Sequence, residues 1–365
     1  MKTICKGIDL SEATTKVEKA CSTRTTNPIL ESIKLTVANN SITLTATDGE
    51  LTIQKSINAD VLEEGSICIP GKYFGELVRK LENDDVCLYT EGPKLTIEYQ
   101  NSECKILTLP AEDFPKVEET VTEKRFAIEC RDLRDLINKT TFCCSQDDSR
   151  PILKGCLIEI KDGAVIFTAI DGYRLAVCKK NIQEICGEIS IICPARALNE
   201  IGRMITGDKE TINVYVQKNY LRVSIDNTVL TTRLYEGDFI NASNIIPKVL
   251  ASEVILDRKE LFQSVERAAI MAKTEKTSLI TMDITEDGMK ISSIATVGSV
   301  DETIKILLEG KDVTISLNCK YVMDCIRAID DEKVKIGLNS PITPCVITPV
   351  VGEEYLYLIL PVRPH

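Results

Sequence analysis

The feature that most constrains this chain is a threefold internal repeat. The run GKYFGELVRKL at 71–81 has apolar residues at Phe74, Leu77, Val78 and Leu81, the spacing of one face of an amphipathic helix. The same spacing recurs 124 residues later in PARALNEIGRMI and 124 residues later again in CKYVMDCIRAI, with one departure at Gly202. Three copies of one helix at a fixed interval predict three similar domains in tandem.

A second helical pattern precedes the first in every copy, and strand-like runs lie between the two. The helical stretches extend over 9–22, 71–82, 129–143, 194–206, 257–273 and 319–329. The alternating runs are expected to form hairpins with turns at Asn39–Asn40, Asp162–Gly163 and Asp287–Gly288, since Asn and Gly adopt the positive φ that such turns need. We therefore predict an α+β fold of three helix–strands–helix–strands domains, at 1–121, 122–247 and 248–365.

Composition restricts the chemistry. The only histidine is His365, which removes a histidine base and every histidine-containing metal site from consideration. Tryptophan is absent and aromatic residues make up 5% of the chain, which disfavours a base-stacking single-strand binder. The cysteines form no C-x-x-C motif. Six of them stand in apolar runs, where we expect reduced core thiols instead of metal ligands or disulfides: Cys68, Cys87, Cys104, Cys156, Cys178 and Cys193. No metal or other cofactor is expected.

The absence of a signal peptide or an apolar run of membrane-spanning length predicts a cytoplasmic protein with no membrane partner. Its net charge is −11, with a pI near 5.0. The six helical stretches carry 16 Lys and Arg against 13 Asp and Glu, so they are slightly basic while the rest of the chain is acidic. Such a partition suits loose contact with phosphates along the helices. The alternative is that these charges form an ordinary solvated surface.

Repeated domains related by a constant rotation close into a ring or extend as a filament. If the helices line a ring at a spacing of ~8–10 Å, six of them leave a bore too narrow for duplex DNA. Twelve helices leave a bore of about 25 Å, which duplex DNA fills loosely. The geometry therefore favours a ring of two chains. A three-domain protein-interaction scaffold that does not bind DNA is the competing interpretation. An enzyme is not expected, because no convergent set of titratable residues stands outside the repeat.

At several places the sequence resembles the β subunit of bacterial DNA polymerase III, the sliding-clamp family. The matching runs are TRTTNPIL at 23–30, TATDGE at 45–50, LPAEDFP at 109–115, SRPILKG at 149–155, AIDGYRLAVC at 169–178 and the terminal YLYLILPVRPH. The resemblance covers the whole chain. It implies a DNA clamp fold and a head-to-tail homodimeric ring with helices lining the pore. It also implies a function as a processivity factor that tethers the replicative polymerase to double-stranded DNA independently of sequence.

The family further implies partners and sites. The partners are the DNA polymerase III catalytic subunit, an ATP-driven clamp loader, and other polymerases and repair proteins that bring short peptide motifs. The implied peptide pocket comprises Arg150, Leu153, Gly172, Tyr173, Arg174, Leu175, Ile245, Tyr321, Ile342, Leu360, Pro361, Val362 and Arg363. Arg24 stands at a position where the family contacts DNA. The other candidate DNA contacts are taken from the expected pore helices: Lys72, Arg79, Arg196, Arg203 and Lys320, with Arg327 on the same helix as the last. Ile270 and Met271 are the expected apolar residues of the dimer interface.

Some of these residues also stand out without the resemblance. Tyr173-Arg174-Leu175 follows the second Asp-Gly and differs from Glu50-Leu51-Thr52 at the equivalent place in the first repeat, which suggests a local task. Arg174 and Arg363 are expected to hold carboxylate groups at the pocket rim. The apolar tail from Leu360 is either part of a pocket or a frayed end. The run FINASNIIP at 239–247 departs from the family pattern, and a less charged pocket rim is expected there.

Overall fold

The computed structural model describes residues 1–362 except Asn83, 117–123, Gln183, Gly187, Lys209 and 275–276. It contains four sheets and six α-helices in the described residues. These residues divide into two compact units, one of Met1–Ile128, Arg203–Thr206 and Glu210–Leu234, the other of Glu129–Gly202, Gly207–Lys209 and Tyr235–His365. The units do not coincide with the three sequence repeats, because sheets continue from one repeat into the next.

The first unit holds the first repeat and four strands of the second. Its smaller sheet has the order β5-β1-β7-β8-β9. The strands of its larger sheet that belong to this unit follow the order β10-β16-β17-β18-β4-β3-β2-β6. Strands β4 and β18 pair antiparallel, with Ile53 opposite Leu230, and so join the repeats. The strands are β1 Lys2–Lys6, β2 Ser32–Ala38, β3 Ser41–Thr47, β4 Leu51–Asn58, β5 Asp60–Glu63, β6 Gly65–Pro70, β7 Asp85–Glu91, β8 Lys94–Tyr99, β9 Ser102–Leu107, β10 Lys124–Glu129, β16 Thr211–Gln217, β17 Tyr220–Ile225 and β18 Thr228–Arg233.

The second unit is built in the same way from the rest of the second repeat and the third. Its nine-stranded sheet has the order β15-β11-β12-β13-β27-β26-β25-β19-β23, and a four-stranded sheet runs β22-β21-β20-β24. Strands β13 and β27 pair antiparallel and join the two repeats. The strands are β11 Gly155–Lys161, β12 Ala164–Ile170, β13 Arg174–Asn181, β15 Ile189–Pro194, β19 Ser252–Asp257, β20 Leu279–Thr285, β21 Gly288–Ala295, β22 Gly298–Ile304, β23 Leu307–Glu309, β24 Val313–Asn318, β25 Lys333–Leu338, β26 Cys345–Pro349 and β27 Tyr355–Ile359.

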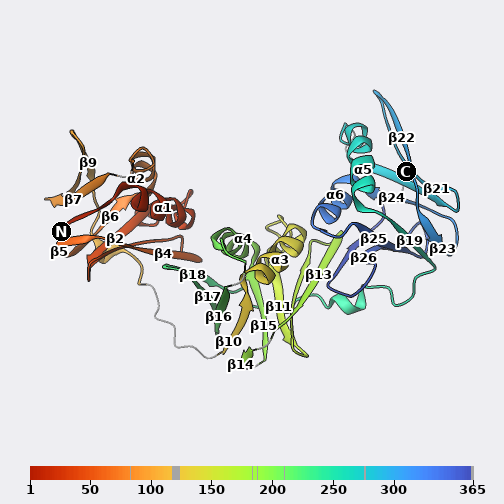
Figure 1. Cartoon of the computed structure of the whole chain (residues 1–365), viewed down its shortest axis with the longest axis horizontal. Coiled ribbons are helices and arrows are strands. Elements are labelled where there is room, and N and C mark those ends of the chain that lie inside the picture. Colours follow the sequence, from red (N-terminus) through yellow and green to blue (C-terminus); the bar gives the residue numbers. More distant parts are fainter. Residues whose placement is uncertain are drawn as a thin grey trace. The chain divides into compact units, whose positions relative to one another are not determined.

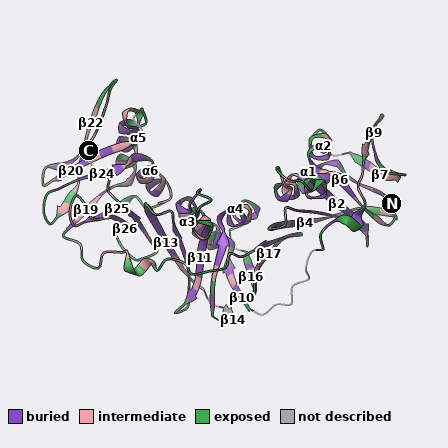
Figure 2. Cartoon of the chain, turned by 180° about the vertical axis from the view of Figure 1, so that it is seen from behind, coloured by how far each residue is buried: buried purple, intermediate pink, exposed green. Residues whose placement is uncertain are grey.

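Each repeat contributes two helices, as the periodicity predicts, and each helix buries its apolar face (Figure 2). The helices are α1 Gly7–Val17, α2 Gly71–Val78, α3 Cys130–Thr140, α4 Ala195–Met204, α5 Arg258–Ala272 and α6 Cys319–Arg327. Helix α1 packs against α2 and α5 packs against α6 (Figure 1). A Cβ at Gly202 would lie 3.4 Å from Cγ2 of Ile137, so the one position that breaks the pattern is where α4 meets α3.

Two of the three predicted hairpin turns are confirmed. Asn39 and Asn40 have φ values of 50° and 53°, and Asp162 and Gly163 have 52° and 76°. The third turn is one residue earlier than predicted, at Glu286–Asp287, because Thr285 pairs with Gly288 at the start of β21. A Cβ at Gly288, where φ is 150°, would lie 2.9 Å from the carbonyl oxygen of Ile304, so this glycine serves strand pairing instead of the turn.

The cysteines of the strand-like runs behave as predicted. Cys68, Cys156, Cys178 and Cys193 are buried free thiols, and Cys87 and Cys104 are half-buried. Burial raises the pKa of Cys156 to about 12 and that of Cys178 to about 11, which keeps both protonated near neutral pH. Within the described residues, no helix combines the length and the apolar composition that a membrane span requires.

Candidate functional site

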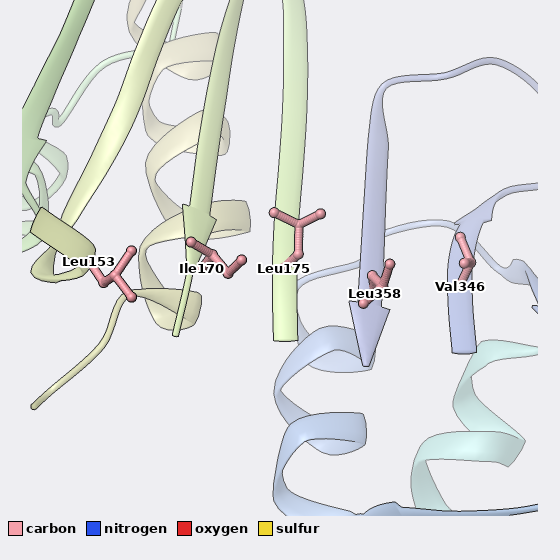
Figure 3. Packing of buried hydrophobic residues seen from close by; sticks show 5 residues of the cluster. All are labelled: Leu153, Ile170, Leu175, Val346 and Leu358. Carbon is pink, nitrogen blue, oxygen red and sulfur yellow. The ribbon is translucent and has the colours of Figure 1, made fainter. Parts of the chain in front are cut away.

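A row of apolar side chains crosses the joint between the second and third repeats. Leu175 of β13 lies opposite Leu358 of β27, and Val346 of β26 lies opposite Leu358 on the other side. With Ile170 at the end of β12 and Leu153 in the 3-10 helix η5 (Pro151–Lys154), they form one buried cluster, each 1–6% exposed. Figure 3 shows the five side chains in line across the strands. We call them the apolar floor.

The loop between the two repeats packs onto this floor. Phe239, Ala242, Ile245, Ile246 and Leu250 are partly buried against it. The loop is held locally, since the Asn241 side chain accepts a hydrogen bond from the Ser243 backbone N–H at the start of the 3-10 helix η6 (Ala242–Asn244). Of the residues predicted for the pocket, the structure thus brings Leu153, Leu175 and Ile245 into one cluster.

Two tyrosines from different repeats stand next to the floor. Tyr173, just before β13, stacks on Tyr321 of α6 with ring centroids 6.3 Å apart. Tyr173 is 63% exposed, whereas Tyr321 is half-buried, and burial raises the pKa of its hydroxyl. The backbone N–H of Leu360 donates to the carbonyl oxygen of Tyr173 at 2.9 Å, which brings the tail to this edge. Tyr173, Tyr321 and Leu360, all predicted for the pocket, therefore lie together.

The tail is tied down on both sides. Besides the bond from Leu360, the backbone N–H of Val362 donates to the carbonyl oxygen of Ser316 in β24 at 2.9 Å. These two bonds exclude the frayed-end interpretation for Leu360 through Val362. Pro361, between them, is half-buried. Arg363, also predicted for the pocket, lies outside the described residues.

The second Asp-Gly is a turn that places the pocket residues. Oδ1 of Asp171 accepts hydrogen bonds from the backbone N–H groups of Tyr173 and Arg174, and Gly172 has a φ of 95°. Asp48 makes the same bonds in the first repeat, so both Asp-Gly pairs form the same turn. A Cβ at Gly172 would lie 3.6 Å from a guanidinium nitrogen of Arg150. Arg150 is exposed, so its charge is available beside the turn.

Arg174 and Ile342, both predicted for the pocket, differ from the prediction in their burial and contacts. Arg174 is only 6% exposed, and its guanidinium donates to Asp171, to Asp324 of α6 and to the backbone carbonyl of Phe142. An arginine already held by three acceptors is not available to take a ligand carboxylate, so its predicted role at the rim is wrong. Ile342 is 66% exposed, in the loop between β25 and β26, and does not belong to the apolar floor.

The charged residues predicted to contact DNA are on the surface. All six of the predicted residues are exposed: Arg24, Lys72, Arg79, Arg196, Arg203 and Lys320. Arg79, however, is engaged by Glu18, with Nη1 2.7 and 2.8 Å from the two carboxylate oxygens. Of the residues predicted for the dimer interface, Ile270 is 62% exposed and Met271 is half-buried. The sulfur of Met271 lies 3.9 Å from the Cβ position of Gly298, at the start of β22.

Sequence reasoning missed part of the site. Ile170, Val346 and Leu358 complete the apolar floor, and Asp324 and Phe142 hold Arg174. Alternation along the terminal strand was a usable signal for Leu358, because Leu356 and Leu358 share one face of it. No comparable local signal marks Asp324 or Phe142, whose partners are distant in sequence.

Comparison with known proteins agrees with this architecture. Three family models match in order: the DNA polymerase III beta subunit N-terminal domain at residues 1–118, central domain at 127–241 and C-terminal domain at 243–363. The beta sliding clamp of Halalkalibacterium halodurans is 29% identical over 364 residues, with 96% of each chain covered. That of Staphylococcus aureus is 28% identical over 358 residues, with 95% of each chain covered.

Solved structures show the same similarity. The DNA polymerase sliding clamp from Bacillus subtilis has a TM-score of 0.96 at 25% identity. The DNA polymerase III beta subunit of Pseudomonas aeruginosa bound to griselimycin has a TM-score of 0.94 at 26% identity. Both comparisons cover 100% of either chain. Since its three domain models span nearly all of the sequence in the family's order, the chain belongs to the DNA polymerase III beta subunit family.

Proposed function

We propose that this chain is a sliding clamp, a non-enzymatic cytoplasmic protein that encircles duplex DNA and tethers the replicative polymerase and other factors to it. The observation that carries the proposal is the succession of three clamp-family domains over residues 1–363. The similar proteins are named sliding clamps. Two helices in each repeat supply the surface from which a helix-lined hole can be built.

A second copy of the chain completes the ring in this proposal. Strands β9 and β22 are edges of their sheets, and edge strands offer unpaired backbone groups to a partner. Exposed apolar residues accompany both edges, with Leu107 64% exposed at the end of β9 and Ile294 and Val297 81% and 73% exposed around the β21–β22 turn. Ile270 lies on α5, which packs against β22. We therefore assign the homodimer contact to β9 of one copy and β22 with α5 of the other.

Contact with DNA is expected to be weak and independent of sequence. Lys72 and Lys320 are exposed on α2 and α6, with Lys320 only 4.0 Å from Asp324. Arg79 is paired with Glu18 through Nη1, which offsets part of its positive charge. Few unpaired cations give few counterions to release on binding, so encirclement and not affinity must retain the clamp.

The apolar floor with its tyrosines and tail is the proposed site for short peptide motifs of the DNA polymerase III catalytic subunit, the clamp loader, other polymerases and repair proteins. Burial of an apolar peptide side chain on such a surface contributes ~1.5–3 kcal/mol. Arg150, exposed beside Gly172, is the guanidinium that an acidic group of the peptide can reach. In this assignment Arg150 takes the rim role that the sequence suggested for Arg174.

The experiment that tests the function measures topological retention. The clamp is loaded by its ATP-driven loader onto a nicked circular plasmid, washed at moderate salt and separated by gel filtration, before and after a restriction enzyme linearises the DNA. We expect retention on the circle and loss from the linear DNA, because an encircling protein slides off an open end. Equal loss from both forms would overturn the ring. A circle treated with heat-inactivated enzyme is the control.

A further inference from the structure

Arg174 is the most constrained charged side chain at the joint of the second and third repeats. Its Nε–H donates to Oδ2 of Asp171 at 2.9 Å, Nη1 donates to Oδ2 of Asp324 at 2.8 Å, and Nη2 donates to the carbonyl oxygen of Phe142 at 2.7 Å. The three acceptors belong to the turn before β13, to α6 and to the 3-10 helix η4 (Thr141–Cys143) that follows α3. One planar group thus fixes three elements from two repeats.

The same guanidinium contacts an aromatic ring of α6. Its central carbon lies 4.5 Å from the ring centroid of Tyr321, a cation–π distance. Tyr321 precedes Asp324 by three residues, so both side chains project from one face of the helix. Arg174 therefore holds α6 twice, through the carboxylate and through the ring. Tyr321 also stacks on Tyr173, the residue next to Arg174 in the chain.

We propose that Arg174 is a positioning residue for peptide binding: it fixes α6 against the Asp171 turn and so holds Tyr321 beside Tyr173, forming an aromatic wall from two repeats. The inference rests on the proposed peptide site. Because its guanidinium is held by three acceptors within the chain, Arg174 is assigned no contact with the peptide. It acts through the tyrosine pair, which borders the floor residues Leu175 and Leu358.

The ion pair of Arg174 with Asp324 has little exposure on both sides, unlike the other ion pairs that join the second and third repeats in the described part of the chain. The side chains of Arg174 and Asp324 are 6% and 18% exposed, so water screens their charges poorly. Loss of the arginine leaves Asp324 with Lys320 at 4.0 Å and Arg327 at 3.7 Å, both on α6 itself and not on the Asp171 turn. The carboxylate then turns toward these cations, and Tyr321 loses its support.

The chain offers a matched control. Lys179 of β13 pairs with Glu353, which precedes β27, at 2.8 Å, so this pair joins the same two repeats. Its side chains are 42% and 84% exposed, and neither belongs to the proposed peptide site. The variants R174K, D324N and K179A thus compare a buried joint contact with an exposed one. R174K retains the positive charge but not the planar fork that meets three acceptors.

The test uses the full-length chain and two readouts. The first is the affinity for a fluorescein-labelled hexapeptide with one acidic residue for Arg150 and three apolar residues for the apolar floor, followed by fluorescence polarisation. The second is the emission of a tryptophan introduced by Y173W in each background, since the chain contains no other tryptophan. We expect R174K to weaken peptide binding roughly tenfold, as loss of a well-placed charged hydrogen bond does. D324N weakens it in the same direction, and both shift the tryptophan emission to longer wavelength, because the indole loses its stacked partner.

The outcomes separate the two levels of the proposal. If the unmodified chain does not bind the hexapeptide, the peptide site itself fails. If it binds and R174K binds equally well with unchanged emission, the positioning role of Arg174 is overturned. Equal weakening by K179A would also overturn it, because the effect would then come from general loosening of the joint. Should R174K not fold, D324N decides the same question, since it keeps the size of the side chain.

Discussion

Removal of the tail from Leu360 onward is the sharpest test of the peptide site. The tail contributes an apolar side chain beside the tyrosine pair and two backbone hydrogen bonds, from Leu360 to Tyr173 and from Val362 to Ser316. We expect a chain ending at Ile359 to lose peptide binding while it still forms a dimer. Val362 lies beside β24, at the opposite edge of its sheet from β22, where the dimer contact is proposed.

The magnitudes follow from these contacts. Leu360 is 36% exposed and Val362 is half-buried, so together they offer a peptide ~2 kcal/mol of apolar burial. A loss of ~2 kcal/mol weakens binding roughly thirtyfold. The two backbone hydrogen bonds contribute about 0.5–1.5 kcal/mol each, so the free energy of unfolding should fall by about 1–3 kcal/mol.

The assay combines fluorescence polarisation with the labelled hexapeptide, light scattering for the dimer and urea unfolding for stability. L360S is the matched variant, because it removes the apolar side chain and keeps the backbone N–H that bonds to Tyr173. A chain lacking only 363–365 isolates the contribution of Arg363. Unchanged peptide affinity in the chain ending at Ile359 would refute the assignment of the tail to the site.

Three further predictions address the assembly and the core. Changing Ile270 and Met271 to Asp should bury unpaired charge at the proposed dimer contact and give monomers, and a dimer at micromolar concentration in light scattering would contradict that interface. Changing Lys72 and Lys320 to Gln should reduce the slope of log affinity against log salt concentration for short linear DNA by up to ~2, while retention on circular DNA is preserved. An unchanged slope would show that these lysines do not face the DNA. Stability should fall as the pH rises above 9. Burial raises the pKa of several thiols from their ordinary value of 9.0 to about 12, so the unfolded state loses these protons first, at up to ~1.36 kcal/mol per pH unit for each group. Urea unfolding at pH 8.0 and 9.5 measures this loss, and equal stability at both values would contradict it. The thiols concerned are Cys5, Cys21, Cys156 and Cys345.

The local features of the fold were predictable because their causes are local. Apolar residues at helical spacing determine a helix wherever the buried face has something to cover it. Each of the six helices overlaps its predicted region, although α1 ends at Val17 and α2 at Val78, before the predicted ends at 22 and 82. Asn39–Asn40 and Asp162–Gly163 turn because their residues tolerate positive φ. The turn near Gly288 was misplaced by one residue for a tertiary reason, since close approach to the carbonyl oxygen of Ile304 requires the glycine.

The peptide site was predictable only in part. The asymmetry between Tyr173-Arg174-Leu175 and the first repeat pointed to the correct turn, and Leu153 and Ile245 do join the apolar floor. The same reasoning gave Arg174 a rim position, because an arginine beside an exposed tyrosine looks available in a linear sequence. Its burial depends on Asp324 and Phe142, which no local pattern connects to it.

The sequence by itself determined the repeat, the helix registers and two of the tight turns, because each depends on residues within a few positions of one another. Only the tertiary structure decided which strands join the repeats. The pairings of β4 with β18 and of β13 with β27 unite segments far apart in the chain, and their register places Leu175 opposite Leu358. The apolar floor and the contacts of Arg174 with its three acceptors form only once these distant strands have paired. Hydrogen bonding between strands determines which strands are neighbours, and side-chain periodicity does not carry that information.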